Sequence, residues 1–263
     1  MSLHDDILAM GQKARKASQE LVRLSSKKKN TIIEAMASEL DARREAIREA
    51  NRADMDAGRA AGLSAAMLDR LELTDSRMDA MIKGLQNVMV LKDPVGARIS
   101  RWIRPNGLEI NKVRVPIGVI CIIYESRPNV TADAAALCFK TSNAVILRGG
   151  SEAIHSNRAI ADALQAGGEK KGLPANAIQL VPTTDREAVR ELVQLEGLVD
   201  LAIPRGGESL IRAVTEQARI PVIKHYKGVC HTYVDETGDL EKAVAICENA
   251  KCQRPGVCNA MET

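Results

Sequence analysis

The predicted fold depends on one stretch of sequence, PIGVICIIYESRPNV at residues 116–130. Its middle, Val119 to Tyr124, is a continuous apolar run, which is typical of a strand buried on both faces of a parallel sheet. Apolar and helical segments alternate after it, with strands expected over 144–147, 178–181, 198–203 and 221–223 and helices over 132–141, 151–164 and 210–218. Five apolar strands joined by helices predict an open parallel sheet with helices on both faces.

Residues before this sheet are predicted to be helical. Apolar side chains recur with a period near 3.6 in one helix over 5–25 and in a second that begins at the lysine cluster 27–29 and runs through Ile47. Ser64 and Thr74 are residue types that cap helix N-termini, and each precedes a further helical region. Within the sheet region, Ser151 is expected to cap a helix in the same way, and residues 184–187 have the pattern of a capping box.

A β-hairpin is predicted between the helical region and the sheet. Polar and apolar residues alternate over 98–104 and again over 108–115, and the turn Pro105-Asn106-Gly107 separates the two runs. We expect Asn106 and Gly107 to supply the positive φ angles of a tight turn. Because a protruding hairpin has exposed edges, we expect another subunit to cover residues 97–115, which predicts a homo-oligomer.

Composition excludes several classes of protein. Net charge is only +3 and aromatic residues make up 2% of the chain, which argues against binding to nucleic acid. The six cysteines form no Cys-x-x-Cys pair and no histidine has zinc-finger spacing, so free thiols in a reducing compartment and no metal are expected. No apolar run reaches about eighteen residues and no signal-peptide core is present. These features predict a soluble cytoplasmic protein that does not enter a membrane.

Three strand ends carry candidate binding residues. Asn129 follows the first strand, where a carboxamide is able to donate a hydrogen bond to an oxyanion, although a simple helix cap is the alternative. Arg148 opens the turn 148–151, at the strand end where a dinucleotide ribose is often bound; a cation there suits a 2′-phosphate, and an ordinary turn is the alternative. Gly206-Gly207 forms a second glycine turn before a helix. The chain contains neither Gly-x-Gly-x-x-Gly nor a P-loop.

Cys258 is the candidate nucleophile. It follows a predicted helix over 239–251 and a Pro255-Gly256 bend, and Arg254 lies close to it in the sequence. A nearby cation or a helix N-terminus favours the reactive thiolate of a cysteine. A lone cysteine is more often a small buried hydrophobic residue, so the functional interpretation depends on the pieces that precede it.

The order of these motifs along the chain resembles that in the aldehyde dehydrogenase superfamily. Within it, the stretches at 116–130, 146–153 and 253–260 resemble those of the γ-glutamyl phosphate reductases, and the resemblance runs along essentially the whole chain. It implies an aldehyde-dehydrogenase-like α/β fold. It also implies roles for individual residues: Cys258 as the nucleophile, Asn129 as the oxyanion donor, and Arg148, Gly149, Gly150, Ser151, Gly206 and Gly207 as contacts of the cofactor.

The resemblance further implies a reaction. This is the NADPH-dependent reduction of L-glutamyl 5-phosphate to L-glutamate 5-semialdehyde and phosphate, through a thioester on Cys258, in proline biosynthesis. NADP(H) is the implied cofactor and L-glutamyl 5-phosphate the implied small-molecule substrate. A homo-oligomer and functional coupling to glutamate 5-kinase are the implied associations.

Two departures from the superfamily pattern bear on this expectation. Aldehyde-oxidising members carry a Glu-Leu-Gly-Gly stretch whose Glu activates water, whereas residues 225–228 are His-Tyr-Lys-Gly; this favours phosphate as the leaving group, with His225 as an alternative base. Family members also continue well beyond the nucleophile. We therefore expect residues 1–224 to form a cofactor-binding domain (helices 5–90, hairpin 97–115, sheet 116–224) and residues 225–263 to begin a truncated catalytic domain. The alternatives are a nucleotide-binding fragment without turnover, and a CoA-acylating or oxidising aldehyde dehydrogenase.

Overall fold

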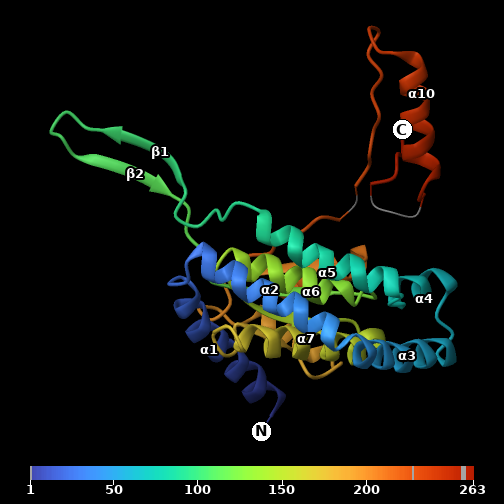
Figure 1. Cartoon of the computed structure of the whole chain (residues 1–263), viewed down its shortest axis with the longest axis horizontal. Helices are drawn as coiled ribbons and strands as arrows, with labels where there is room; N and C mark the ends of the chain where they lie inside the picture. Colours follow the sequence, from blue (N-terminus) through green and yellow to red (C-terminus); the bar gives the residue numbers. More distant parts are fainter. Residues whose placement is uncertain (1, 227, 256–258) are drawn as a thin grey trace.

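The computed structural model describes residues 2–226, 228–255 and 259–263 (Figure 1). At its centre is a parallel sheet. The four strands lie in the order β5-β4-β3-β6 and comprise β3 (Val119–Tyr124), β4 (Ala144–Arg148), β5 (Ile178–Leu180) and β6 (Leu201–Arg205). All six residues of β3 are buried, as expected for an inner strand. The predicted parallel sheet is confirmed.

The fifth predicted strand, at residues 221–223, is reduced to one parallel bridge between Ala202 and Val222. Ile223 donates its amide to the carbonyl of Ala202, with 3.0 Å between the two atoms. Pro221 has no N–H with which to extend the ladder toward the N-terminal side. The prediction of a full strand here is therefore wrong, although the segment does lie beside β6.

Helices cover both faces of the sheet. Helices α6 (Asn129–Lys140) and α7 (Ile154–Glu169) pack on one face. Helices α1 (Leu3–Leu21), α8 (Glu187–Val193) and α9 (Glu208–Gln217) cover the other. Burying the apolar side chains of both layers against the strands supplies the main stabilisation, at roughly 1.5–3 kcal/mol for each large side chain.

The order in which strands are added to the sheet reverses beside β3. From β3 the chain moves outward through α6 to β4 and through α7 to β5, and it then returns across the sheet to place β6 on the opposite side of β3. Connecting helices change faces at this point. In open α/β sheets ligands bind beyond the carboxyl ends of the strands at such a reversal. The fold therefore directs attention to the ends of β3 and β6.

An outer layer of helices covers α6 and α7. It consists of α2 (Ser26–Ala42), α3 (Arg44–Ala60), α4 (Ala65–Leu71) and α5 (Asp75–Val90) (Figure 1). The single helix expected from the lysine cluster onward is two helices, because the backbone leaves the helical region at Arg43 (φ −100°, ψ 16°). The break lets α2 pack between α5 and α7 while α3 packs on α7 and α4.

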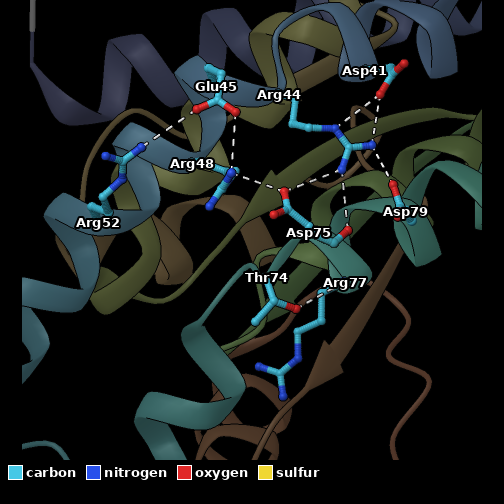
Figure 2. A network of polar contacts seen from close by, with 9 residues as sticks. All are labelled: Asp41, Arg44, Glu45, Arg48, Arg52, Thr74, Asp75, Arg77 and Asp79. Carbon is cyan, nitrogen blue, oxygen red and sulfur yellow. Dashed lines mark hydrogen bonds and ion pairs between the residues drawn. The ribbon is translucent and has the colours of Figure 1, made fainter.

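Arg44 joins the beginnings of α3 and α5 on the surface. Its guanidinium contacts Asp41 at 2.9 Å and Asp79 at 2.5 Å, and neighbouring Arg48 contacts Asp75 at 3.2 Å (Figure 2). Exposed ion pairs of this kind contribute about 0–1 kcal/mol each. The network therefore orients the two helices more than it stabilises them.

Helix starts differ in how well the sequence anticipates them. Ser64 and Thr74 cap α4 and α5 through their side-chain oxygens, as predicted. Ser151 does not cap an α-helix: it begins a 3₁₀ turn over Ser151–Ala153, and α7 begins at Ile154. The start of α7 is instead capped by the buried carboxylate of Asp54, which accepts the backbone N–H of Ser156 at 2.7 Å.

No capping box forms at residues 184–187, because helix α8 begins only at Glu187 and has no reciprocal side-chain cap. Asp185 instead accepts the backbone N–H of Glu187 across a short turn, at 2.9 Å. The local pattern thus correctly predicts a helix start near these residues, but the hydrogen-bonded turn that precedes the helix differs from a capping box.

The predicted hairpin is present and projects from the helical layers (Figure 1). Strands β1 (Arg98–Ile103) and β2 (Glu109–Val113) pair antiparallel, and nearly all of their residues are exposed. Gly107 has a positive φ of 83°, whereas Asn106 does not; the Asn106 side chain accepts the backbone N–H of Leu108 instead. Only the glycine therefore supplies the positive φ expected of the Asn-Gly pair.

Helix α10 (Leu240–Cys252) lies apart from the sheet and its covering helices (Figure 1). Asp239 caps it by accepting the N–H of Lys242 at 3.1 Å, and none of its residues is buried. The chain returns beside its own earlier segment, where Met261 forms a bridge with Cys230. The division into domains at residues 224 and 225 stays a prediction.

Within the described residues, no helix combines the length and apolar character required to cross a lipid bilayer.

Candidate active site and cofactor site

Asn129 is the first residue of α6, directly after the loop that leaves β3. It does not cap this helix: Pro128 occupies the N-cap position and no side-chain cap bond forms. The Asn129 amide nitrogen instead donates to Asp133 Oδ2, one turn further along the helix, at 3.0 Å. This bond assigns the nitrogen end of the carboxamide and leaves its second N–H available as a donor.

Asp133 is a partly buried carboxylate. Burial raises its pKa, and the hydrogen bond from Asn129 opposes that rise. An ionisable group near a cavity with a pKa perturbed by burial is a recognised mark of a functional site. Asp133 was not among the residues that the sequence singled out, because a lone Asp in a helix has no pattern of its own.

A cavity of about 460 Å³ opens in front of Asn129 and Asp133. Its other walls come from α4, α5 and the segment just before Cys258, and they include Arg127 and Arg254. Arg77 also lines it and is held by Asp69, whose pKa the Arg77 guanidinium lowers. The structure thus brings Asn129 and Arg254 to one cavity.

Cys258 itself, the predicted nucleophile, lies outside the described residues. Of the other cysteines, Cys121 and Cys138 are buried, and burial raises the pKa of each thiol to about 12. A thiol with so high a pKa is not a nucleophile near neutral pH. Cys121 and Cys138 therefore fit the structural roles of small core residues.

A second cavity, of about 520 Å³, lies at the reversal of strand order. The ends of β3 and β4, the β5–α8 loop and the inner side of α9 form its walls. Three of the predicted cofactor contacts line it: Arg148, Gly150 and Ser151. Of the other three, Gly206 and Gly207 lie just before the α9 residues Ser209 and Leu210 that also line it, and Gly149 is not among its lining residues.

Gly149 is required by the packing of the chain itself. A Cβ atom on it would lie 2.1 Å from Nδ2 of Asn157, a buried residue of α7. At Gly207, by contrast, a Cβ would meet only ordinary contacts at 3.9 Å. Because neither packing nor backbone angle demands a glycine there, Gly207 fits a position where a ligand approaches the backbone closely.

Two glutamates that the sequence did not single out line this second cavity. Glu125 accepts the backbone N–H of Gly207 at 2.9 Å, at the start of α9. Glu152 accepts the N–H of Ser126 at 2.5 Å and its hydroxyl at 2.7 Å. Glu125 and Ser126 directly follow β3, so their place after an inner strand was the signal available in the sequence.

The second cavity fits a dinucleotide. It lies at the carboxyl ends of parallel strands and at a helix N-terminus, and its positive groups are Arg148 and Arg186. Helix N-termini and cations both favour the phosphates of such a ligand. No cluster of His, Cys, Asp and Glu suited to a metal ion occurs among the residues described.

This α/β fold is found in a known family of proteins. The model of the aldehyde dehydrogenase family matches residues 2–262, and the chain belongs to that family. The expected superfamily and α/β fold are thereby confirmed.

Relatives within the family are more specific. The chain is 52% identical over 263 residues to the γ-glutamyl phosphate reductase of Desulfatibacillum aliphaticivorans and 54% identical over 262 residues to that of Solidesulfovibrio magneticus. It covers 63% and 62% of these proteins, respectively, so it spans less than two thirds of the curated relatives it matches.

Solved structures include similar proteins. The crystal structure of γ-glutamyl phosphate reductase from Thermotoga maritima superposes with a TM-score of 0.92 at 45% identity, over 97% of this chain and 62% of that one. An acetylating aldehyde dehydrogenase from Geobacillus thermoglucosidasius matches with a TM-score of 0.70 at 16% identity, over 98% of this chain and 54% of that one. The second likeness shows the fold alone.

Proposed function

We propose that this chain forms the cofactor-binding part, and the beginning of the catalytic part, of a γ-glutamyl phosphate reductase. The reaction is the NADPH-dependent conversion of L-glutamyl 5-phosphate to L-glutamate 5-semialdehyde and phosphate. The identities of 52–54% to curated γ-glutamyl phosphate reductases extend over the whole chain and support this choice. The likeness to CoA-acylating and oxidising aldehyde dehydrogenases is a likeness of fold, so those activities are not favoured.

One observation carries the proposal. Asn129, oriented by Asp133, lines the same cavity as Arg254, which stands just before Cys258 in the sequence. The proposed oxyanion donor and the segment that precedes the proposed nucleophile thus line one cavity. The residues that directly follow β3 lead from this cavity to the one proposed for the dinucleotide. This pairing is what acyl transfer to a cysteine followed by reduction requires.

The chemistry then follows from the side chains. The thiolate of Cys258 forms a bond to the acyl carbon of the substrate, and the bond from that carbon to the phosphate oxygen breaks, so phosphate leaves with the electron pair. The free N–H of Asn129 stabilises the developing oxyanion, a contribution of roughly 3–4 kcal/mol for one donor. The hydride that reduces the thioester comes from NADPH. The thiohemiacetal on Cys258 then loses its carbon–sulfur bond, which releases the aldehyde and restores the thiolate.

The residues that would hold the cofactor line the second cavity. The backbone at Gly206 and Gly207 and the start of α9 suit the pyrophosphate, and the turn Arg148 to Ser151 suits the adenosine ribose. The absence of a carboxylate from residues 225–228 fits this chemistry, because a thioester without an activated water persists until hydride reaches it. The active protein is proposed to be a cytoplasmic homo-oligomer built through the hairpin, with functional coupling to glutamate 5-kinase.

The proposal is tested by assaying the reverse reaction, which is phosphate-dependent reduction of NADP by glutamate 5-semialdehyde. The enzyme is prepared at the full length of its relatives, with Cys258→Ser and Asn129→Ala variants. Cys258→Ser is expected to abolish turnover, and Asn129→Ala is expected to lower kcat by about 10²–10³-fold. Cys252→Ser is the matched control, because Cys252 is an exposed thiol close by in the sequence and is expected to be dispensable.

Two outcomes would reject the proposal. If turnover does not depend on phosphate, the acyl-phosphate chemistry is wrong. If Cys258→Ser retains activity while Cys252→Ser loses it, the nucleophile has been misassigned.

A further inference from the structure

Two arginines line the cavity at the end of β4, and their environments differ. The guanidinium of Arg148 donates to three backbone carbonyls, those of Gly149 at 3.0 Å, Thr184 at 2.8 Å and Asp185 at 3.4 Å. Arg148 is only 9% exposed, and its Nε is buried without a partner. Both terminal nitrogens of the guanidinium therefore already donate to the chain itself, and the remaining nitrogen, Nε, is buried, which leaves few donors of Arg148 accessible to an anionic ligand.

Arg186 lies on the rim of the same cavity and is exposed. Among the described residues, its guanidinium has no hydrogen-bonded or ion-paired partner. Its guanidinium lies close enough to Arg148 to affect the pKa of that residue. Burial lowers the pKa of Arg148, Glu152 raises it, and the positive charge of Arg186 lowers it. Of the two arginines that line this cavity, Arg186 is thus the one whose donors remain available.

The position of these residues indicates which part of a dinucleotide they face. In sheets of this kind, the residue at the end of the second strand binds the 2′-oxygen of the adenosine ribose, and a nearby cation accommodates a 2′-phosphate. Here the second strand of the sheet along the chain is β4, which ends at Arg148. Glu152 also lines the cavity, and one oxygen of its carboxylate, Oε1, accepts both the N–H and the hydroxyl of Ser126, which fixes this side chain against the β3–α6 loop.

We propose that Arg186 binds the 2′-phosphate of the cofactor, and that Arg148 is a positioning residue that fastens the β5–α8 loop on which Arg186 lies. Arg148 achieves this through the carbonyls of Thr184 and Asp185, directly before Arg186 in the chain. The inference rests on the proposed function and deepens it, because it moves the source of NADP preference from the buried arginine to the exposed one.

The test uses this chain and two ligands that differ only in the 2′-phosphate: adenosine 2′,5′-bisphosphate and adenosine 5′-monophosphate. Isothermal titration calorimetry gives the ratio of the two dissociation constants. The wild-type chain is expected to bind the bisphosphate about tenfold or more tightly, and Arg186→Gln is expected to lose that preference while its affinity for the monophosphate stays within about twofold. Arg190→Gln is the matched control, because Arg190 lies one turn into helix α8, which directly follows Arg186, and is paired with Glu187.

A double-mutant cycle tests the role of Arg148. Arg148→Gln is expected to reduce the preference for the bisphosphate when Arg186 is present, and to reduce it no further in the Arg186→Gln background, since it acts through Arg186. A purely structural role would instead weaken the binding of both ligands equally.

Besides equal weakening of both ligands by Arg148→Gln, three results would overturn the inference. The first is an unchanged preference in Arg186→Gln, and the second is a further loss on adding Arg148→Gln to Arg186→Gln, which would mean that Arg148 itself contacts the phosphate. In either case nucleotide binding remains and the proposed cofactor site stands. The third is a wild-type chain that binds neither ligand, which would reject the cofactor site and the inference together.

Discussion

The side-chain amide of Asn129 donates to Asp133 one helical turn further along α6, with 3.0 Å between Nδ2 and Oδ2. Because one N–H is engaged in this way, the other has a defined direction. We expect Asp133→Ala to lower kcat about tenfold with little change in KM, since a donor that is no longer oriented loses part of its effect in the transition state. Asp133→Asn retains an oxygen acceptor and is expected to preserve most of the activity.

Steady-state kinetics of the enzyme at the length of its relatives provide the measurement. If Asp133→Ala and Asp133→Asn were equally impaired, the charge of Asp133 and not its hydrogen bond to Asn129 would matter. If Asp133→Ala matched the wild type, Asn129 would not depend on this contact at all.

Glu125 directly follows β3, and its carboxylate lies at the start of α9, where it accepts the N–H of Gly207 at 2.9 Å. A cofactor pyrophosphate at this helix start would have to displace that negative charge. We therefore expect Glu125→Gln to bind NADP about three- to tenfold more tightly, because a charge at a helix N-terminus is worth roughly 0.3–2 kcal/mol. Glu208→Gln, in the first turn of the same helix and paired with Arg212, serves as the control.

Calorimetric titration of this chain with NADP measures the effect of Glu125→Gln. Weaker binding by Glu125→Gln would show that the glutamate contacts the cofactor favourably instead of competing with it. An equal gain in Glu208→Gln would attribute the effect to overall charge.

Lys29 forms a buried ion pair with Asp93 that ties α2 to the segment leading into the hairpin. The two charged atoms are 2.6 Å apart, and the side chains are 2% and 9% exposed. Asp93→Asn leaves the ammonium of Lys29 buried without its counter-charge, so we expect the free energy of unfolding to fall by about 3 kcal/mol at pH 7. Asp41→Asn, which removes one exposed partner of Arg44, is expected to cost less than about 1 kcal/mol.

The effect of Asp93 on stability depends on pH. Burial alone would raise the pKa of Asp93, but hydrogen bonds from Lys29, Val95 and Ser26 outweigh it, so the pKa lies below its ordinary value of 3.8. A lowered carboxyl pKa contributes stability that is present above the ordinary value and is lost as the pH falls through the folded-state value. Urea unfolding is therefore expected to show the difference between wild type and Asp93→Asn narrowing below that value. A difference that does not change with pH would contradict this account.

Trp102 is the only tryptophan of the chain, and it lies on the hairpin with 44% of its surface exposed. If a second subunit covers the hairpin, the emission of Trp102 is expected to move to shorter wavelengths as the full-length protein associates. Ile103→Lys, which places a charge on the same exposed strand, is expected to weaken association by about tenfold or more. Asn106→Ser in the hairpin loop is the control.

Sedimentation of these variants over a range of concentrations provides the second measurement. Association that is unaffected by Ile103→Lys would mean that the hairpin edge is not covered by another copy of the chain.

The pattern of residues along the chain predicted most of the local structure. The apolar run of β3, the alternation of strands and helices after it, the caps at Ser64 and Thr74 and the hairpin all depend on neighbouring residues, whose spacing is visible in the sequence. The errors occur where a distant residue replaces a local partner. Asp54 caps α7 from another helix, so the serine expected to do so has a different role.

In the candidate site, too, some features follow from the local sequence and others only from the tertiary structure. By itself, the sequence determined the parallel α/β sheet and placed Asn129, Arg148 and the glycine turns at the ends of its strands, because side-chain period and strand ends are local properties. Only the tertiary structure decided the strand order, which puts β6 beside β3, and the distribution of charge around the resulting cavity. The sequence does not reveal that Arg148 is buried and bonded to the β5–α8 loop whereas Arg186 is exposed, because burial and hydrogen-bond partners are set by residues that are far apart in the chain.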